Sequence, residues 1–76
     1  MNKKNQEIIL IDFFREKGFL IEPNSTDLYD IGAIDSFGII ELLSYIEEKF
    51  DLSIKPQNLV LDNFRTIDSI LDLLNT

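Results

Sequence analysis

A chain of 76 residues that contains no cysteine and no histidine is expected to form one small domain, which hydrophobic packing must stabilise because no disulfide can. Hydrophobic residues make up 45% of the chain and charged residues 28%, which is typical of a soluble globular domain rather than of a disordered acidic tail. The net charge of −7 argues against nucleic acid and anionic membranes as partners, because their phosphates would be repelled, and favours a basic partner.

The missing residue types also exclude several kinds of chemistry. Histidine is the commonest general base and metal ligand, and without it a serine hydrolase has no partner for its nucleophile. The fourteen Asp and Glu residues do not follow the pattern of a calcium-binding loop. An enzyme built on carboxylates alone would need a convergent polar cleft, which a chain of this length has little room to build. We therefore expect a protein that is not an enzyme.

The sequence gives no signal for membrane insertion. The longest apolar run, Ile8–Ile11, is too short to cross a bilayer, and Met1–Lys4 is not followed by the apolar stretch of a secretory signal. Absent cysteine agrees with a reducing compartment. Because there is no internal repeat and no second domain, we expect a single domain over residues 1–76. Because the membrane and secretion signals are missing, we expect it in the cytoplasm.

The apolar pattern predicts a first helix over Asn5–Lys17, which Gly18 can terminate. Its apolar positions are dense enough for a broad buried stripe, formed by Ile8, Ile9, Leu10, Ile11, Phe13 and Phe14. Residues 19–34 are rich in turn-forming residues and predict a long loop, of a length that usually serves a site. Its apolar side chains are expected to pin it to the core, namely Leu28, Tyr29 and Ile31.

A second helix is predicted over Ser36–Phe50. Helical spacing places Phe37, Ile40 and Ser44 on one line. The core-facing side is expected to carry Ile39, Leu42, Leu43, Ile46 and Phe50.

The remaining chain predicts an extended stretch over residues 52–55, a short helical turn over Pro56–Leu61 and a last helix capped by Thr66. The last helix has an apolar stripe of Ile67, Ile70, Leu71 and Leu74. Residues 19–21 and 52–54 could each form a strand, but an isolated pair of three-residue strands would be marginal. We predict an all-α fold, a small bundle of three main helices and one short helix.

Ser36 stands where the long loop gives way to the second helix. A hydroxyl in the first turn of a helix lies beside N–H groups without intrahelical partners, which favours an attached anion such as a phosphate. The plainer interpretation is that Ser36 is only an N-cap or a first-turn residue. Asp35 can itself be the helix cap, and these interpretations are compatible. The acidic charge concentrates around this point: between Asp27 and Asp51, seven acidic residues face one base, Lys49, a local sum of −6.

The segment Ile31–Gly38, followed by Ile39-Ile40-Glu41-Leu42-Leu43, resembles the attachment motif of acyl carrier proteins, and the resemblance extends over essentially the whole chain. In that family a serine after an aspartate bears a covalent 4'-phosphopantetheine arm. The resemblance therefore implies that Ser36 is the modified residue and Asp35 its neighbour in the motif. It implies that the surface offered to partner enzymes consists of Phe37, Ile40, Glu41, Ser44, Glu47 and Glu48.

The same resemblance implies a monomeric carrier that holds an acyl or aminoacyl group as a thioester and presents it to the enzymes of a dedicated biosynthetic pathway. Its expected partners are a phosphopantetheinyl transferase, an acyl- or aminoacyl-loading ligase, and a downstream acyltransferase or condensing enzyme, all with basic docking patches. The absence of cysteine suits this role, because no internal thiol competes for the thioester.

The cargo is less well defined by the sequence. Residues 35–38, Asp-Ser-Phe-Gly, look like D-alanyl carrier proteins, whereas residues 63–67 look like stand-alone carriers and peptidyl carrier domains. Phe37 stands where fatty-acid carriers typically have leucine, and Ala33-Ile34 where peptidyl carriers commonly have a glycine pair. We expect an aminoacyl or small acyl cargo, with a D-alanyl carrier or a fatty-acid carrier as alternatives. The alternative from another class is an acidic helical adaptor without a prosthetic group.

Overall fold

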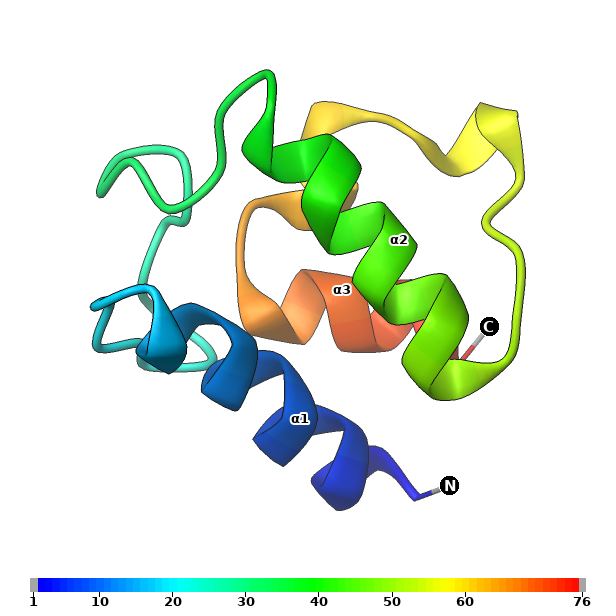
Figure 1. The fold of residues 1–76 in the computed structure, drawn as a ribbon, viewed down its shortest axis with the longest axis horizontal. Helices are drawn as coiled ribbons and strands as arrows, with labels where there is room; N and C mark the ends of the chain where they lie inside the picture. The colour runs from blue at the N-terminus through cyan, green and yellow to red at the C-terminus, as the bar shows by residue number, and fades with distance from the viewer. Residues whose placement is uncertain (1, 76) are drawn as a thin grey trace.

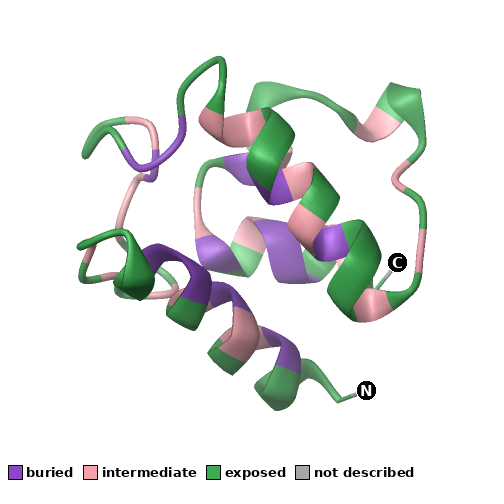
Figure 2. Cartoon of the chain, in the orientation of Figure 1, coloured by how far each residue is buried: buried purple, intermediate pink, exposed green. Residues whose placement is uncertain are grey.

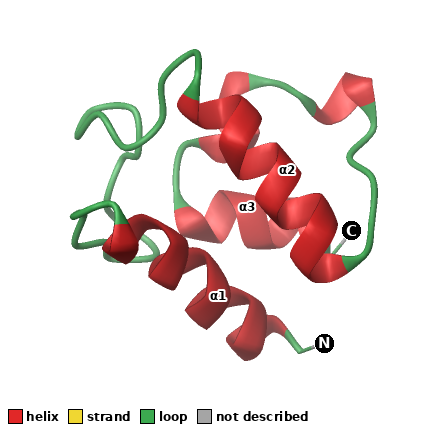
Figure 3. Ribbon diagram, viewed as in Figure 1, coloured by secondary structure: helices red, strands yellow, loops and turns green. Residues whose placement is uncertain are grey.

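The computed structural model describes residues 2–75, which form three α-helices and two short 3-10 helices (Figure 1). They are α1 (Lys3–Glu16), α2 (Gly38–Phe50), η1 (Pro56–Asn58), η2 (Leu61–Phe64) and α3 (Ile67–Leu74). Residues 2–75 contain no strand, so the all-α prediction is confirmed (Figure 3). The prediction of one short helix over Pro56–Leu61 is wrong in detail, since two 3-10 helices form instead. They are separate because Val60 between them is extended, with φ −115° and ψ 151°.

The first helix begins and ends slightly earlier than predicted, because of its caps. The Asn2 side chain accepts the N–H of Asn5 at 2.8 Å, which starts α1 at Lys3. At the other end Gly18 adopts φ +95°, its N–H donates to the Arg15 carbonyl, and the next N–H, of Phe19, donates to the Phe14 carbonyl. This paired arrangement is a Schellman motif, in which glycine takes the left-handed conformation without steric cost. Gly18 thus terminates the helix as predicted.

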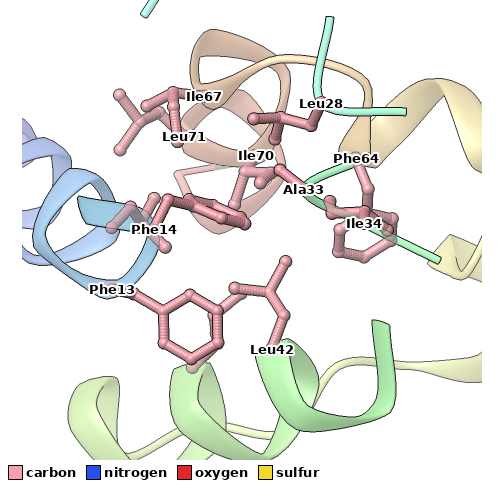
Figure 4. Packing of buried hydrophobic residues seen from close by; sticks show 12 residues of the cluster. Phe13, Phe14, Leu28, Ala33, Ile34, Leu42, Phe64, Ile67, Ile70 and Leu71 are labelled. Carbon is pink, nitrogen blue, oxygen red and sulfur yellow. The ribbon is translucent and has the colours of Figure 1, made fainter. Parts of the chain in front are cut away.

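One hydrophobic core joins the three helices, η2 and the first connection, which is the segment 17–37 between α1 and α2 (Figures 2 and 4). The close-up in Figure 4 shows side chains from all of these elements converging, with Phe13 and Phe14 of α1 in edge-to-face contact at 5.1 Å. The buried apolar residues are Leu10, Phe13, Phe14, Leu28, Ala33, Ile34, Leu42, Ile46, Phe64, Ile67, Ile70 and Leu71. The predicted stripe on α1 is wrong at Ile8, which is exposed, whereas Gln6 is buried and accepts a hydrogen bond from Asn75 at 2.8 Å.

The long first connection is pinned to the core, as predicted, and its anchor is Leu28. This side chain is fully buried, and its backbone N–H donates to the Arg65 carbonyl at 2.7 Å. The Leu28 carbonyl in turn accepts the N–H groups of Ala33 and Ile34. Ile31 does not help to pin the loop, because its side chain is exposed. The anchor therefore brings the residues before Ser36 against the core.

The last helix is capped as predicted: the Thr66 hydroxyl accepts the N–H of Ser69 at 3.1 Å. A second tie links this end of α3 to the first connection, because the Asp68 N–H donates to the Pro23 carbonyl at 2.9 Å. Within residues 2–75, no helix has the length and apolar character needed to cross a membrane.

Candidate functional site

Ser36 lies in the exposed turn that leads into α2. The Asp35 carboxylate accepts the N–H groups of Phe37 at 3.1 Å and Gly38 at 2.7 Å, and the Asp35 carbonyl accepts the N–H of Ile39 at 3.0 Å. The Asp35 side chain therefore caps the turn that leads into α2, as its position before Ser36 predicted. The regular helix starts at Gly38 rather than at Ser36, with Phe37 as its boundary residue.

The glycine after Phe37 makes room for this cap. A Cβ atom at position 38 would lie 3.2 Å from the Asp35 carboxylate and 3.6 Å from the Ala33 carbonyl oxygen. The first distance is tighter than ordinary van der Waals contact, so a side chain here would push the capping carboxylate away. Gly38 therefore has a local structural reason, beyond being tolerated in the first turn.

An open apolar groove begins at Ser36. It has a volume of about 390 Å³ and is lined by Tyr29, Ile34, Asp35, Ser36, Ile39 and Leu61. A second hollow of about 250 Å³ shares three of these residues, Tyr29, Ile39 and Leu61, and continues towards Leu43 and Phe64. Two other hollows, of about 260 and 290 Å³, lie against α3 and do not include Ser36. The hydroxyl thus stands at one end of an apolar surface channel between α2 and η2.

The six residues expected to face partner enzymes are all exposed on α2 or its first turn. Phe37 is 84% exposed and Ile40 is 62% exposed, which is unusual for side chains of this size and makes them an accessible apolar patch. Ser44, Glu41, Glu47 and Glu48 are also exposed. The structure therefore places these residues on accessible surface, and their role in docking stays a prediction.

The three glutamates of this surface differ in their contacts. Glu41 forms an ion pair with Lys17, the residue that caps the C-terminus of α1. Glu47 accepts the backbone N–H of Ile54 at 3.0 Å and so holds the segment after α2. Among residues 2–75, no hydrogen bond or ion pair involves the Glu48 side chain. No sequence pattern predicts these differences, because the partners of Glu41 and Glu47 lie outside α2.

Arg65 holds one wall of the groove. Its guanidinium donates to the Asp27 carboxylate at 3.1 Å and lies 5.6 Å from the centre of the Tyr29 ring. The Tyr29 hydroxyl donates to the Leu61 carbonyl, and burial raises the pKa of this tyrosine. The pKa of Asp27 is lowered, first by the N–H of Asp30 and further by Arg65.

These wall residues were not identified as functional from the sequence. Aspartate at the start of a turn is a recognisable signal, and Asp27 does accept the N–H groups of Tyr29 and Asp30, both at 3.0 Å. The pairing of Asp27 with Arg65, 38 positions away, has no such local signal.

Comparison with known families decides the class of this protein. Residues 18–74 match the model of the phosphopantetheine attachment site, which covers well over half of the chain. The chain belongs to this family. The carrier protein has no catalytic function of its own, and its cofactor is covalently attached 4'-phosphopantetheine. An exposed hydroxyl beside an apolar groove fits such a group, because the phosphate needs access and the arm has apolar surface beside it.

Curated relatives and a solved structure agree with this assignment. The D-alanyl carrier proteins of Streptococcus gordonii and Streptococcus mutans are each 33% identical over 74 residues, covering 95% of this chain and 90% of theirs. A chain in the crystal structure of Bradyrhizobium japonicum glycine:[carrier protein] ligase, complexed with its cognate carrier protein and an analogue of glycyl adenylate, superposes with a TM-score of 0.73. That match is 16% identical, covers 96% of this chain and 94% of the other, and shows the shared fold.

The Asp35 cap can be tested by substitution. Asp35→Ala should lower the free energy of unfolding by about 1 kcal/mol, because the N–H groups of Phe37 and Gly38 lose their acceptor. Asp35→Asn keeps an acceptor oxygen and should retain most of the stability. Urea unfolding followed by circular dichroism measures both variants, and equal losses in the two would contradict the capping role.

The lowered pKa of Asp27 predicts a pH dependence. Its contribution to stability should be fully present above the ordinary aspartate pKa of about 3.9 and lost as the pH falls through the lower pKa of the folded state. Asp27→Asn removes the titrating group. Wild type should therefore be the more stable protein at pH 6, and this advantage should shrink in urea unfolding as the pH is lowered towards 2. A difference that stays constant across that range would exclude this contribution.

Proposed function

We propose that Ser36 carries the 4'-phosphopantetheine arm and that the single domain of residues 1–76 acts as a discrete carrier for an aminoacyl or small acyl group. The observation that supports this most directly is the exposed Ser36 hydroxyl, which lies inside the family match, directly after the capping Asp35 and at the end of the apolar groove. The capped turn keeps the hydroxyl accessible, and the helix N-terminus favours the negative phosphodiester by about 0.3–1 kcal/mol at an exposed position.

The attachment is a phosphoryl-group transfer from coenzyme A, carried out by a separate transferase. The Ser36 oxygen forms a new bond to the phosphorus that bears the pantetheine group, and the pyrophosphate P–O bond of coenzyme A breaks. Adenosine 3',5'-bisphosphate leaves, and the hydroxyl proton passes to a base of the transferase or to water. The carrier supplies the hydroxyl and its position, and the arm then supplies the thiol that forms the thioester.

The aminoacyl cargo is supported by the relatives, since the matching curated proteins are D-alanyl carrier proteins. Its loading partner would then be an adenylating ligase, and the solved structure that shares the fold contains a ligase of this general kind. A downstream acyltransferase or condensing enzyme would take the cargo from the arm. Because coenzyme A supplies the arm, we propose that the protein acts in the cytoplasm. We also propose that it acts as a monomer.

The proposed docking surface consists of Phe37, Ile40, Glu41, Ser44, Glu47 and Glu48. Phe37 and Ile40 form its apolar part at the start of α2. Glu41 lies beside them in the first turn, and Glu47 and Glu48 follow towards the end of the helix. A partner of matching chemistry would present an apolar recess near the attachment point and Lys or Arg side chains farther along the helix. Such charges mainly raise the association rate and fix the orientation of the complex.

Ser36→Ala tests the attachment site. Incubation with coenzyme A and a broad-specificity phosphopantetheinyl transferase should add the mass of one 4'-phosphopantetheine group to wild type and none to Ser36→Ala. Ser25→Ala, which removes an exposed hydroxyl of the first connection outside the proposed docking surface, should be loaded like wild type. Intact-mass spectrometry measures the three proteins. A wild type that stays unmodified, with a transferase shown to load a control carrier, would support the adaptor alternative.

Glu48→Lys tests the acidic part of the surface. Within residues 2–75 it removes no side-chain hydrogen bond or ion pair. Reversal of this charge should lower kcat/KM of the phosphopantetheinyl transferase for attachment of the arm by about twofold to fivefold at low ionic strength. This factor is typical of one exposed charge pair. Glu22→Lys, an equal charge change in the exposed first connection, is the matched control. If both variants slow loading equally, the effect reflects net charge and Glu48 has no specific part in docking.

A further inference from the structure

A cluster of four side chains joins the C-terminal end of α1 to α2. Phe13 of α1 lies four residues before Lys17, which caps this helix, and Glu41 and Tyr45 lie one turn apart on α2. The rings of Phe13 and Tyr45 are 4.6 Å apart, and the Lys17 ammonium lies 5.0 Å from the centre of the Phe13 ring. The same ammonium forms the ion pair with Glu41. Lys17 is thus oriented by an aromatic ring below it and a carboxylate beside it.

The ion pair lies at the edge of the proposed docking surface and is open to solvent. The Glu41 side chain is 57% exposed and the Lys17 side chain 37% exposed. Glu41 stands one helical turn after Phe37, on the same face of α2. An exposed ion pair contributes little to stability, so another cation can displace Lys17 at a small cost in free energy. A guanidinium is well suited to do so, because it binds a carboxylate through two parallel hydrogen bonds.

We infer that Lys17 is an internal counter-ion that competes with basic side chains of the phosphopantetheinyl transferase for Glu41 and so limits how strongly the transferase docks. This inference rests on the proposed function, because it assumes loading at Ser36. In the free carrier the Lys17 ammonium occupies the position that a basic group of the transferase takes in the complex.

The surrounding charges support a specific role for this lysine. Seven acidic residues face one base, Lys49, between Asp27 and Asp51, and Lys49 lies over the ring of Tyr45 at 5.7 Å. Lys17 comes from outside that segment and brings a positive charge to the first half of α2. It therefore lowers the negative potential over the first half of α2, whereas no such contact reaches Glu48 within residues 2–75.

The experiment measures kcat/KM of the phosphopantetheinyl transferase, here called loading, at low ionic strength. The proteins compared are wild type, Lys17→Met, Glu41→Gln and the double variant. Methionine keeps an unbranched apolar chain that can lie on Phe13 while removing the charge. Lys17→Met should load about twofold to fivefold faster than wild type, and Glu41→Gln should load more slowly by a similar factor. In the Glu41→Gln background, Lys17→Met should change nothing, because the group it competes for is gone.

Lys4→Met is the matched control, since it changes the net charge equally but lies 13 residues earlier on α1, about 20 Å along the helix axis. It should load at the rate of wild type. The gain from Lys17→Met should vanish at high salt, where exposed charges are screened. Circular dichroism confirms that the variants are folded, and Lys17→Gln should reproduce the gain with a different side chain.

The outcomes separate the two proposals. If wild type is loaded at Ser36 but Lys17→Met and Lys17→Gln are loaded no faster than Lys4→Met, the inference is wrong and the proposed function stands. A gain that persists in the Glu41→Gln background also overturns the inference, because Lys17 then acts through another group. If wild type takes no arm, both the proposed function and the inference fall.

Discussion

The position of the attachment site depends on the anchoring of the first connection at Leu28. This side chain is buried among the helices, its N–H donates to the Arg65 carbonyl, and its own carbonyl receives the N–H groups of Ala33 and Ile34. Backbone groups inside a core must find partners, and these bonds satisfy them while fixing the path of the chain. Only because Ile34 is held against the core does Asp35 stand where it can cap α2 and leave Ser36 in the solvent.

Arg65 serves this anchor with both its backbone and its side chain. The carbonyl holds Leu28, and the guanidinium binds Asp27 and covers the Tyr29 ring. Tyr29 then forms a wall of the groove beside Ser36 and is tied to η2 through the Leu61 carbonyl. One residue just before α3 thereby connects the last third of the chain to the site, which explains how a segment without regular structure can present the Ser36 hydroxyl in a defined place.

The acidic surface of α2 is more differentiated than its composition suggests. Glu41 is paired with Lys17 at the end of α1, and Glu47 supports the segment that follows α2. Glu48 is exposed and has no hydrogen bond or ion pair within residues 2–75. Equal charges on one helix can therefore differ in their availability to a partner, because tertiary contacts have already engaged some of them. In a carrier protein that several enzymes must recognise, such differences offer a physical basis for discrimination between partners.

Local signals in the sequence were sufficient to predict the three α-helices and to single out Ser36 as the proposed attachment residue. The apolar periods predicted three main helices, Gly18 predicted a helix end that needs a positive φ, and Thr66 predicted a cap; all three are observed. Asp35 and Ser36 could be singled out because a cap and a first-turn hydroxyl are defined by residues within four positions of each other. The start of α2 was misplaced by two residues, since the extent of capping depends on side-chain geometry.

Only the tertiary structure decided which side chains from distant parts of the chain meet. The exposure of Ile8 and Ile31, the pairing of Asp27 with Arg65 and the contact between Lys17 and Glu41 all follow from how the helices and the loop pack. A sequence period identifies an apolar face but not how much of that face a neighbour covers, and it gives no signal for ion pairs between residues 24 or 38 positions apart. The sequence by itself thus pointed to Ser36 as the proposed attachment position, and packing determined which charges remain free around it.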